Sequence, residues 1–282
     1  MKTTIAVVFD FDETLAPDTT SSFLNSFGVD VRDFWKNRAQ SLIDAGWDPI
    51  PAYLYLMIKE SEARPAGKRI TREALSKWGP RIKLYNGVTR IFGRIEKHAQ
   101  SIDAEARVEF YVISSGIGEI VRSTKIARYF TEIWASDFEY NAVEEIMFPK
   151  KVISFTDKTR YLFHISKGII GPQSHSTPFE VNKKIPEEDF RIPFNQIIYL
   201  GDGFTDIPCF SLVRRQGGIA IGVYDQEDRE KWGKAWGFVE DGRVSNLVPA
   251  DYGQNSALVN SLLMAVGAIA NRISLRKKTY QG

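Results

Sequence analysis

The sequence predicts an α/β fold with a parallel sheet in its core and a smaller α-helical module beside it. Three apolar runs have the composition of strands that are covered on both faces: residues 5–9, 108–113 and 196–200. Polar or acidic side chains follow each run: Asp10 and Asp12, then Ser114, then Asp202. Ligands in such sheets bind where the parallel strands end, so we expect a functional site at this edge.

Residues 17–85 are predicted to form the helical module, because nothing in this stretch resembles another buried strand. Three helices are expected here: one capped by Asp30 and ended by Gly46, one over residues 52–61, and one from Thr71 to Gly79. Their apolar residues recur at helical spacing, and we expect them to form the module's own core.

The α/β pattern resumes at Tyr85. Helices are expected over residues 88–100, 118–129, 156–168 and 257–273, and further strands over 133–135, 152–155 and 218–223. Residues 169–195 lack clear periodicity and are expected to form a long surface excursion, and residues 276–278 a solvated basic end. Residues 1–16 and 86–282 are therefore predicted to form one discontinuous core, into which residues 17–85 are inserted.

The composition excludes several classes of protein. Thirty-seven basic against 35 acidic residues leave a net charge of +2, too even a balance for binding to nucleic acid or to an anionic membrane. Cys209 is the only cysteine, which excludes an intramolecular disulfide and a multi-cysteine zinc site and fits a reducing compartment. The N-terminus lacks the pattern of a secretory signal, and no apolar run approaches the roughly 20 residues of a membrane span. We expect a cytoplasmic protein, and nothing in the sequence predicts its oligomeric state.

The acidic residues at the strand ends predict a bound cation. Side chains alternate along an extended chain, so Asp10 and Asp12 point to the same side. Two carboxylates about 4 Å apart repel by about 4 kcal/mol at an effective dielectric constant near 20, and Asp202 and Asp206 add to this charge. Carboxylates without histidine or cysteine nearby favour Mg²⁺, which also accepts a phosphate oxygen. The alternative, that Asp10 and Asp12 only cap a turn, does not explain the second acidic strand end.

Four motifs in order along the chain resemble those of the haloacid dehalogenase-like (HAD) superfamily: Asp10-Phe11-Asp12-Glu13-Thr14, the strand ending at Ser114, a downstream lysine, and Gly201-Asp202 with Asp206. The chain is most similar to the phosphoserine-phosphatase-like branch, whose helical cap lies between the first and second motifs, as residues 17–85 do. The resemblance covers almost the whole chain. It implies a three-layer Rossmann-like core with a helical cap, a Mg²⁺-dependent phosphatase activity, and a small phosphorylated metabolite as substrate.

The two acids of the first motif are expected to share the chemistry. A carboxylate can attack phosphorus as a nucleophile, a role that we assign to Asp10. Asp12 would protonate the leaving oxygen and then activate water, which requires a raised pKa. The resemblance implies that Asp10, Asp202 and the backbone carbonyl of Asp12 bind the metal, and that Asp206 orients the waters of the metal.

The phosphoryl oxygens need donors and positive charge. We expect these donors to be Ser114 and the backbone NH groups of Ser115 and Gly116, at a helix start. Thr14 belongs to the same phosphate site, with a largely structural role. Lys158, after Thr156-Asp157 at the start of a predicted helix, stands where the resemblance puts the motif lysine; the alternatives are Lys150, Lys151, Lys183 and Lys184.

The sequence departs from phosphoserine phosphatases where those enzymes receive the amino group of the substrate. They carry a glutamate nine residues after the nucleophile, a position that is Thr19 here, with Asp18 beside it. They usually have serine at the position of Glu13 and glycine at that of Ser115. We therefore expect a different phosphomonoester, with specificity in residues 17–85. Seven aromatic residues there either form core or line a pocket for a flat or methylated amine group: Phe23, Phe27, Phe34, Trp35, Trp47, Tyr53 and Tyr55.

Three classes of function are compatible with these motifs. The preferred one is a Mg²⁺-dependent phosphatase that hydrolyses a small phosphomonoester through an aspartyl-phosphate on Asp10. A phosphotransferase or mutase would pass the phosphoryl group to an alcohol instead of water. A non-catalytic binding protein on the same fold would be expected to have lost at least one motif, and none is lost.

Overall fold

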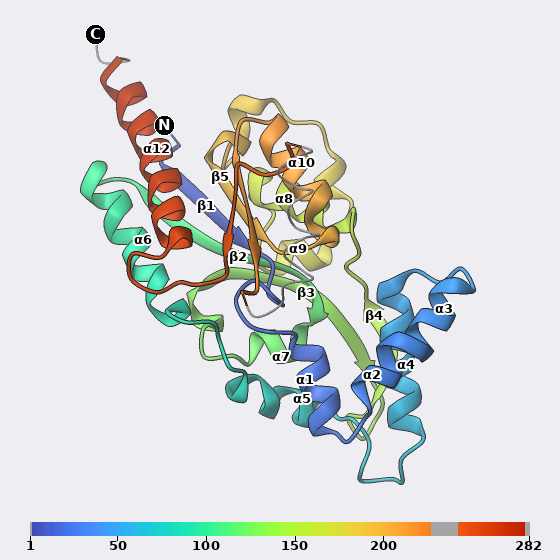
Figure 1. Ribbon diagram of the computed structural model, residues 1–282. Coiled ribbons are helices and arrows are strands. Elements are labelled where there is room, and N and C mark those ends of the chain that lie inside the picture. Colours follow the sequence, from blue (N-terminus) through green and yellow to red (C-terminus); the bar gives the residue numbers. More distant parts are fainter. Residues whose placement is uncertain (1, 227–241, 280–282) are drawn as a thin grey trace.

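A single sheet in the order β4-β3-β2-β1-β5-β6-β7 forms the centre of the molecule (Figure 1). This computed structural model describes residues 2–226 and 242–279. The strands are β1 Thr4–Phe9, β2 Arg107–Ile117, β3 Phe130–Tyr140, β4 Ile146–Lys151, β5 Ile197–Gly201, β6 Ile219–Tyr224 and β7 Asn246–Pro249. Every neighbouring pair is parallel except β3 and β4. The chain passes from β1 to β2 on one side and later to β5 on the other, so the end of β1 is the switch point at which such sheets bind ligands.

Helices cover both faces of the sheet, which confirms the predicted α/β class. They are α1 Thr19–Ser26, α2 Val31–Asp33, α3 Gln40–Asp44, α4 Pro49–Glu62, α5 Arg72–Trp78, α6 Val88–Ile102, α7 Gly118–Arg122, α8 Asp157–Lys167, α9 Pro172–Ser176, α10 Ile207–Arg215 and α12 Ala257–Thr279. Helices α6 and α12 pack on one face, and α8 and α10 on the other (Figure 1). Along β1, Val7 and Phe9 belong to the first core cluster and Ala6 and Val8 to the second, as the pleat of a doubly covered strand requires.

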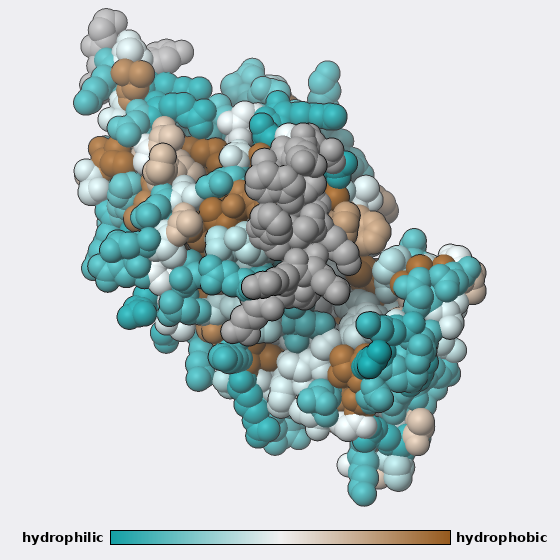
Figure 2. Space-filling model, in the orientation of Figure 1, coloured by the Kyte–Doolittle hydropathy of each residue, from teal (hydrophilic) through white to brown (hydrophobic). Residues whose placement is uncertain are grey.

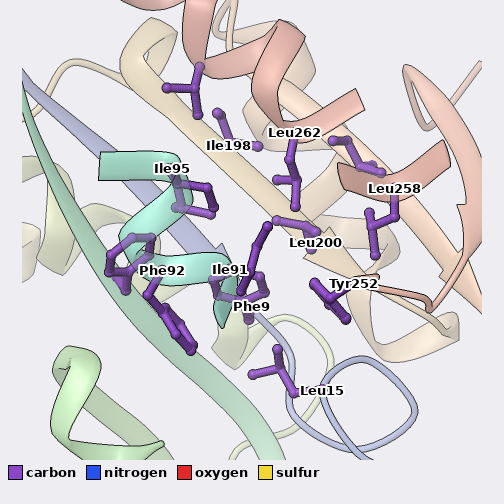
Figure 3. Close-up of a cluster of buried hydrophobic side chains, with 14 of the residues drawn as sticks. Phe9, Leu15, Ile91, Phe92, Ile95, Ile198, Leu200, Tyr252, Leu258 and Leu262 are labelled. Carbon is purple, nitrogen blue, oxygen red and sulfur yellow. The ribbon is translucent and has the colours of Figure 1, made fainter. Parts of the chain in front are cut away.

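The larger core cluster joins β1 and β5 to α6 and α12 (Figure 3). Leu262 of α12 is fully buried there, together with Phe9, Ile91 and Leu200. Cys209 is buried in the other cluster, where it acts as a small apolar packing residue. On the face seen in Figure 2, hydrophilic side chains predominate and apolar ones form separate patches.

We expect Leu262→Ala to lower the free energy of unfolding by about 3 kcal/mol, because it removes buried methyl groups and leaves a cavity. Met264→Ala on the same helix is the matched control, since Met264 is 75% exposed. It should change the free energy by less than about 0.5 kcal/mol. Urea unfolding followed by circular dichroism measures both, and equal effects of the two variants would contradict the assignment of Leu262 to the core.

The helices between residues 17 and 85 lie together at one end of the molecule, where β3 and β4 reach them (Figure 1). Asp30 accepts a hydrogen bond from the backbone of Asp33, and Thr71 accepts one from that of Ala74, so both predicted caps are present. A π-helical stretch, Phe34–Ala39, joins α2 to α3. The limits of 17 and 85 for a separate module stay a prediction.

The apolar residues of these helices form a common cluster, as the sequence predicts, but other segments also contribute to it. Their apolar cluster includes Phe138 of β3, Ile146 of β4 and Ile120 of α7. The backbone NH of Ile146 donates to the carbonyl of Ile70 at 3.0 Å, so the start of α5 is hydrogen-bonded to the hairpin formed by β3 and β4. This hairpin extends the sheet into the helical region and fixes the position of the helices relative to the strand ends.

Several predicted elements differ in extent. The helix expected over residues 118–129 ends at Arg122, because the Thr124 hydroxyl and NH both bond the carbonyl of Val121 and close a turn. Residues 152–155 are not a strand, and the NH of Ile153 donates to the side chain of Ser136. The excursion at 169–195 contains the short helix α9, and β7 is a strand that the sequence pattern does not predict.

Helix α12 is longer than predicted and continues through the basic end. Lys277 makes ion pairs with Asp103 and Glu105, just after α6, at 2.8 Å each, whereas Arg276 and Lys278 are exposed, so the basic end is largely solvated, as predicted. Among residues 2–226 and 242–279, α12 is the one helix whose length and composition would allow a membrane span. Half of its apolar stretch is buried inside the protein, as in an ordinary core helix, so this is weak evidence for a span.

Candidate active site

Lys158 connects Asp10, at the end of β1, to Asp206, in the helical turn Phe204–Asp206 that follows β5. Its ammonium nitrogen lies 2.7 Å from Asp10 Oδ2, 2.7 Å from Asp206 Oδ1 and 3.0 Å from Thr205 Oγ1. These three acceptors use all three protons of the ammonium group, and the side chain is fully buried, so its position is fixed. Burial lowers the pKa of Lys158, but Asp10 and Asp206 more than offset this, and the net pKa is raised.

The alternative lysines lie elsewhere. Lys150, Lys151 and Lys183 pair with acids that do not belong to the group around Asp10, and Lys184 is exposed. Lys158, at the first turn of α8, is the lysine that the fold brings to the predicted site.

Asp206 is held by partners that the sequence pattern does not reveal. Tyr199, a buried residue of β5, donates its hydroxyl to Asp206 Oδ1 at 2.7 Å, and the backbone NH of Gly203 donates to Oδ2. A Cβ on Gly201 would lie 2.4 Å from the Asp206 carboxylate, so the backbone approach requires glycine there. A signal for Tyr199 is present, because it lies in the predicted strand three residues before Asp202, but its apolar neighbours predict only packing.

Three carboxylates converge at this point. One oxygen each of Asp10, Asp202 and Asp206 lies within 4.8 Å of the others, and the backbone NH of Asp10 donates to the carbonyl of Leu200, which holds β1 against β5. Burial raises the pKa of Asp10 to about 6, because it outweighs the opposite effect of Lys158. The charge of Asp206 adds to the increase. Burial, Asp206 and Asp10 raise the pKa of Asp202. One lysine therefore does not neutralise the group, and its oxygen ligands fit a hard divalent cation such as Mg²⁺.

The excess of negative charge over positive charge in this group predicts that folding stability depends on pH in opposite directions with and without Mg²⁺. Because the pKa of Asp10 is raised from 3.8 to about 6 on folding, the folded state binds more protons, and metal-free stability should fall as pH rises from about 4 to 6. Mg²⁺ needs the ionised acids, so its stabilising effect should appear over the same interval and reach about 1–3 kcal/mol near neutral pH. Thermal melts at pH about 5 and about 7.5, with Mg²⁺ or with EDTA, measure both trends. Asp202→Asn should lose the response to Mg²⁺, and a Mg²⁺-independent melting temperature of the unaltered chain at neutral pH would contradict the assignment.

Asp12 lies beside this group but faces another way. Its Oδ1 accepts a hydrogen bond from the backbone NH of Thr19 at 2.7 Å, at the start of α1. A Cβ on Gly116 would lie 2.3 Å from Asp12 Oδ2, so this glycine leaves the space that the carboxyl group occupies. Burial, with the charge of Asp18 next, raises the pKa of Asp12 to about 7. A carboxyl group with this pKa can both donate and accept a proton near neutral pH.

Residues 114–116 are near Asp12 and belong to a strand that runs three residues beyond its predicted end at Ser114, so their NH groups are not at a helix start. Strand β2 continues to Ile117 and α7 begins at Gly118, because the register with β3 shifts between Ile113 and Ile117 and keeps the chain extended. The NH of Gly116 donates to Ser114 Oγ at 3.0 Å. Thr14 is fully buried and its carbonyl accepts a hydrogen bond from Tyr252, so it lies behind the site and holds the first motif in place.

A cavity of about 480 Å³ opens from these residues towards the helical region. The residues that line it on the side of the strand ends include Asp10, Asp12, Ser114, Ser115, Gly116 and Asp202. From the helical region, Asp18, Thr20, Trp35, Pro49, Ile50 and Tyr53 line it. Phe204, Tyr224 and Asp225 also contribute, and the sequence pattern predicts none of the three. Two of the seven aromatic residues singled out in the sequence, Trp35 and Tyr53, therefore reach the cavity.

Comparisons with known proteins agree with this architecture. No protein-family model matches the sequence. An uncharacterized protein of Borreliella burgdorferi is 25% identical over an alignment of 288 positions, which covers 92% of this chain and 95% of that one. A crystal structure of a HAD-family hydrolase from Salmonella enterica serovar Typhi superposes with a TM-score of 0.56 at 13% identity, over 86% of this chain and 66% of that chain. A probable phosphoserine phosphatase from Vibrio cholerae, in unliganded form, superposes with a TM-score of 0.54 at 10% identity, over 96% of this chain and 67% of that chain.

The fold is that of the HAD hydrolases, in the form seen in phosphoserine phosphatases. The predicted HAD-type α/β core is thereby confirmed, and the chain spans about two thirds of the length of each of these two structures. At these identities the likeness concerns the fold, and the chemistry of the site rests on the residues described above.

Within this HAD fold, the positions that depart from phosphoserine phosphatases have distinct surroundings. Thr19 is fully buried and does not line the cavity, so it does not contact a leaving group there. Glu13 does line the cavity and has a backbone φ of 56°. Its carboxylate accepts hydrogen bonds from the NH of Asp18 and the hydroxyl of Tyr85, which connects the first motif to the start of α1.

Proposed function

We propose that the protein is a Mg²⁺-dependent phosphatase that hydrolyses a small phosphorylated metabolite through an aspartyl-phosphate on Asp10. The observation that carries the proposal is the buried ammonium of Lys158, 2.7 Å from both Asp10 and Asp206, with Asp202 in the same group of acids and a cavity opening at Asp10. Such a group combines a nucleophile, a fixed positive charge and ligands for a cation.

The first half-reaction forms a bond between a carboxylate oxygen of Asp10 and phosphorus. The bond from phosphorus to the leaving oxygen breaks, and Asp12 gives its proton to that oxygen. Lys158 donates to Asp10 Oδ2 at 2.7 Å, and the NH of Phe11 donates to Oδ1 at 2.7 Å. The rotation of the Asp10 carboxylate is thus set by two hydrogen bonds before the substrate arrives.

The second half-reaction returns Asp10 to its starting state. Asp12, now ionised, takes a proton from water, the water oxygen bonds to phosphorus, and the bond from phosphorus to Asp10 breaks to release inorganic phosphate. The pKa of about 7 suits Asp12 to both directions of proton transfer. Ser114 and the backbone around Ser115 and Gly116 would hold the phosphoryl oxygens.

Asp10, Asp202 and the carbonyl of Asp12 would hold Mg²⁺, with Asp206 in support. When bound, the cation offsets negative charge on the phosphoryl group and on these acids. The helices between residues 17 and 85 would cover the reacting centre and exclude water from it.

Phosphate release from p-nitrophenyl phosphate tests the proposal. We expect turnover with Mg²⁺ and none with excess EDTA, and a panel of phosphomonoesters should then rank the natural substrates. Product analysis with added acceptor alcohols separates hydrolysis from transfer, and hydrolysis should dominate. Mg²⁺-independent turnover would contradict the proposed cofactor, and phosphoryl transfer in excess of hydrolysis would support the phosphotransferase instead.

A further inference from the structure

Every charged side chain that the described residues contribute to the cavity lining is an acid. The six are Asp10, Asp12, Glu13, Asp18, Asp202 and Asp225. Lys158 balances part of the charge around Asp10, but it is fully buried behind the cavity. In the proposed mechanism Mg²⁺ and Lys158 offset the charge of Asp10 and Asp202, and Asp12 carries a proton. The acid that a leaving group meets as it extends from the phosphoryl site towards α1 is then Asp18, which favours a cation and opposes an anion.

We propose that this cavity selects phosphomonoesters whose leaving group carries an ammonium cation, held by the rings of Trp35 and Tyr53 and by the carboxylate of Asp18. The proposal rests on the phosphatase function proposed above and names the substrate class of the same site.

The rings of Trp35 and Tyr53 pack against each other and are held in place by hydrogen bonds. Their centroids are 5.6 Å apart and their planes are tilted by 54°. The indole NH of Trp35 donates to Ser21 Oγ at 2.7 Å, and the hydroxyl of Tyr53 donates to the carbonyl of Ser115 at 2.6 Å. Both polar ends are thus satisfied within the protein. What the two residues offer to the cavity is aromatic surface, more of it from the partly exposed Trp35 than from Tyr53, which is 5% exposed, and aromatic faces bind ammonium groups, quaternary ones included.

Asp18 is connected to Trp35 through hydrogen bonds to Ser21. Its carboxylate accepts hydrogen bonds from the NH and from the hydroxyl of Ser21, whose oxygen in turn receives the indole NH of Trp35. A carboxylate has about four acceptor positions, so two are left after these bonds. Asp18 is partly exposed and lines the cavity, and it therefore offers charge to a ligand without losing its role as the cap of α1.

A comparison of two isosteric substrates tests directly whether the site selects a positively charged leaving group. Phosphocholine and 3,3-dimethylbutyl phosphate share a shape, but a quaternary carbon replaces the nitrogen in the second. With Mg²⁺ present, we expect kcat/KM to be about tenfold or more higher for phosphocholine, from cation–π contacts together with Asp18. Phosphoethanolamine and phosphoserine form a second pair, in which the added carboxylate of phosphoserine should lower kcat/KM by a similar factor.

Single substitutions test which residues discriminate between the charged and the neutral isostere. Asp18→Asn keeps an oxygen that can cap α1 but removes the charge, and Trp35→Leu removes one ring. Each should bring the ratio of kcat/KM for the two isosteres to within about threefold of one. Trp47→Leu is the matched control, because Trp47 belongs to the same helical region, packs on Tyr55 and is 40% exposed outside the cavity. It should leave the ratio unchanged.

The experiments distinguish an enzyme without cationic selectivity from a protein without phosphatase activity. Equal kcat/KM for the two isosteres, or hydrolysis of p-nitrophenyl phosphate without hydrolysis of either isostere, would overturn the cationic selectivity and leave the phosphatase intact. Absence of turnover on every ester, p-nitrophenyl phosphate included, would overturn both. A ratio unaffected by Asp18→Asn and Trp35→Leu would overturn the assignment of these residues.

Discussion

Replacing Asp10 by asparagine should lower the rate of phosphate release by at least about 10³-fold. The amide is a poor nucleophile, and its nitrogen cannot accept the hydrogen bond that Lys158 donates at 2.7 Å. The measurement is single-turnover phosphate release from p-nitrophenyl phosphate with saturating Mg²⁺. Circular dichroism and the urea midpoint report whether the variant remains folded.

The control for this variant is Asp48→Asn. Asp48 is exposed, precedes α4 and forms no side-chain cap, so the substitution removes one acid without touching the site. It should retain full activity. Normal turnover by a folded Asp10→Asn variant would remove the basis of the proposed mechanism.

Replacing Lys158 by methionine should be the most destabilising single change at the site, lowering the free energy of unfolding by about 3–5 kcal/mol near neutral pH. Methionine preserves much of the volume but leaves Asp10 and Asp206 buried without their shared cation. Urea unfolding measures the loss. The effect should be smaller at pH about 5, because the pKa of Asp10, already raised by burial, rises further without Lys158, and Asp10 is then largely protonated in the folded variant.

Lys150→Met provides the comparison, because Lys150 makes an exposed ion pair with Glu139. Such pairs contribute at most about 1 kcal/mol. If Lys158→Met were as stable as Lys150→Met at neutral pH, the buried acids would have to be neutral in the folded protein, and Lys158 would not be their counter-charge. We also expect Mg²⁺ to restore part of the stability of the Lys158→Met variant, because the cation offsets the same negative charge.

The parts of this fold that follow from local composition could be predicted from the sequence. The strand that ends just before Asp10 is a continuous apolar run, and its residues are indeed buried on both faces. Lys158 could be located because it opens a helix with a clear apolar stripe, and Asp202 because it ends a second apolar run. Their convergence follows from parallel strands ending at one edge of a sheet.

The parts that depend on contacts between distant segments could not be predicted. Phe138 and Ile146 lie on a hairpin whose pairing with the start of α5 leaves no local pattern in residues 17–85. The extended path through Ser114 and Gly116 is held by β3, so the local polar and glycine-containing pattern wrongly predicted that the strand ends at Ser114. Tyr199 has the composition of a core residue, and only the three-dimensional approach of Asp206 gives its hydroxyl a role.

The most direct test of the central claim is to detect the covalent intermediate. The Asp12→Asn variant lacks the group that activates water, so with p-nitrophenyl phosphate, whose leaving group needs little protonation, the phosphorylated enzyme should accumulate. Acid quenching, proteolysis and mass spectrometry should then find one phosphoryl group on the peptide that contains Asp10, labile to hydroxylamine, and none when Asp10 is also replaced by asparagine. A phosphoryl group on any other residue, or rapid turnover by Asp12→Asn with no modified peptide, would contradict the assignment of Asp10 as the nucleophile.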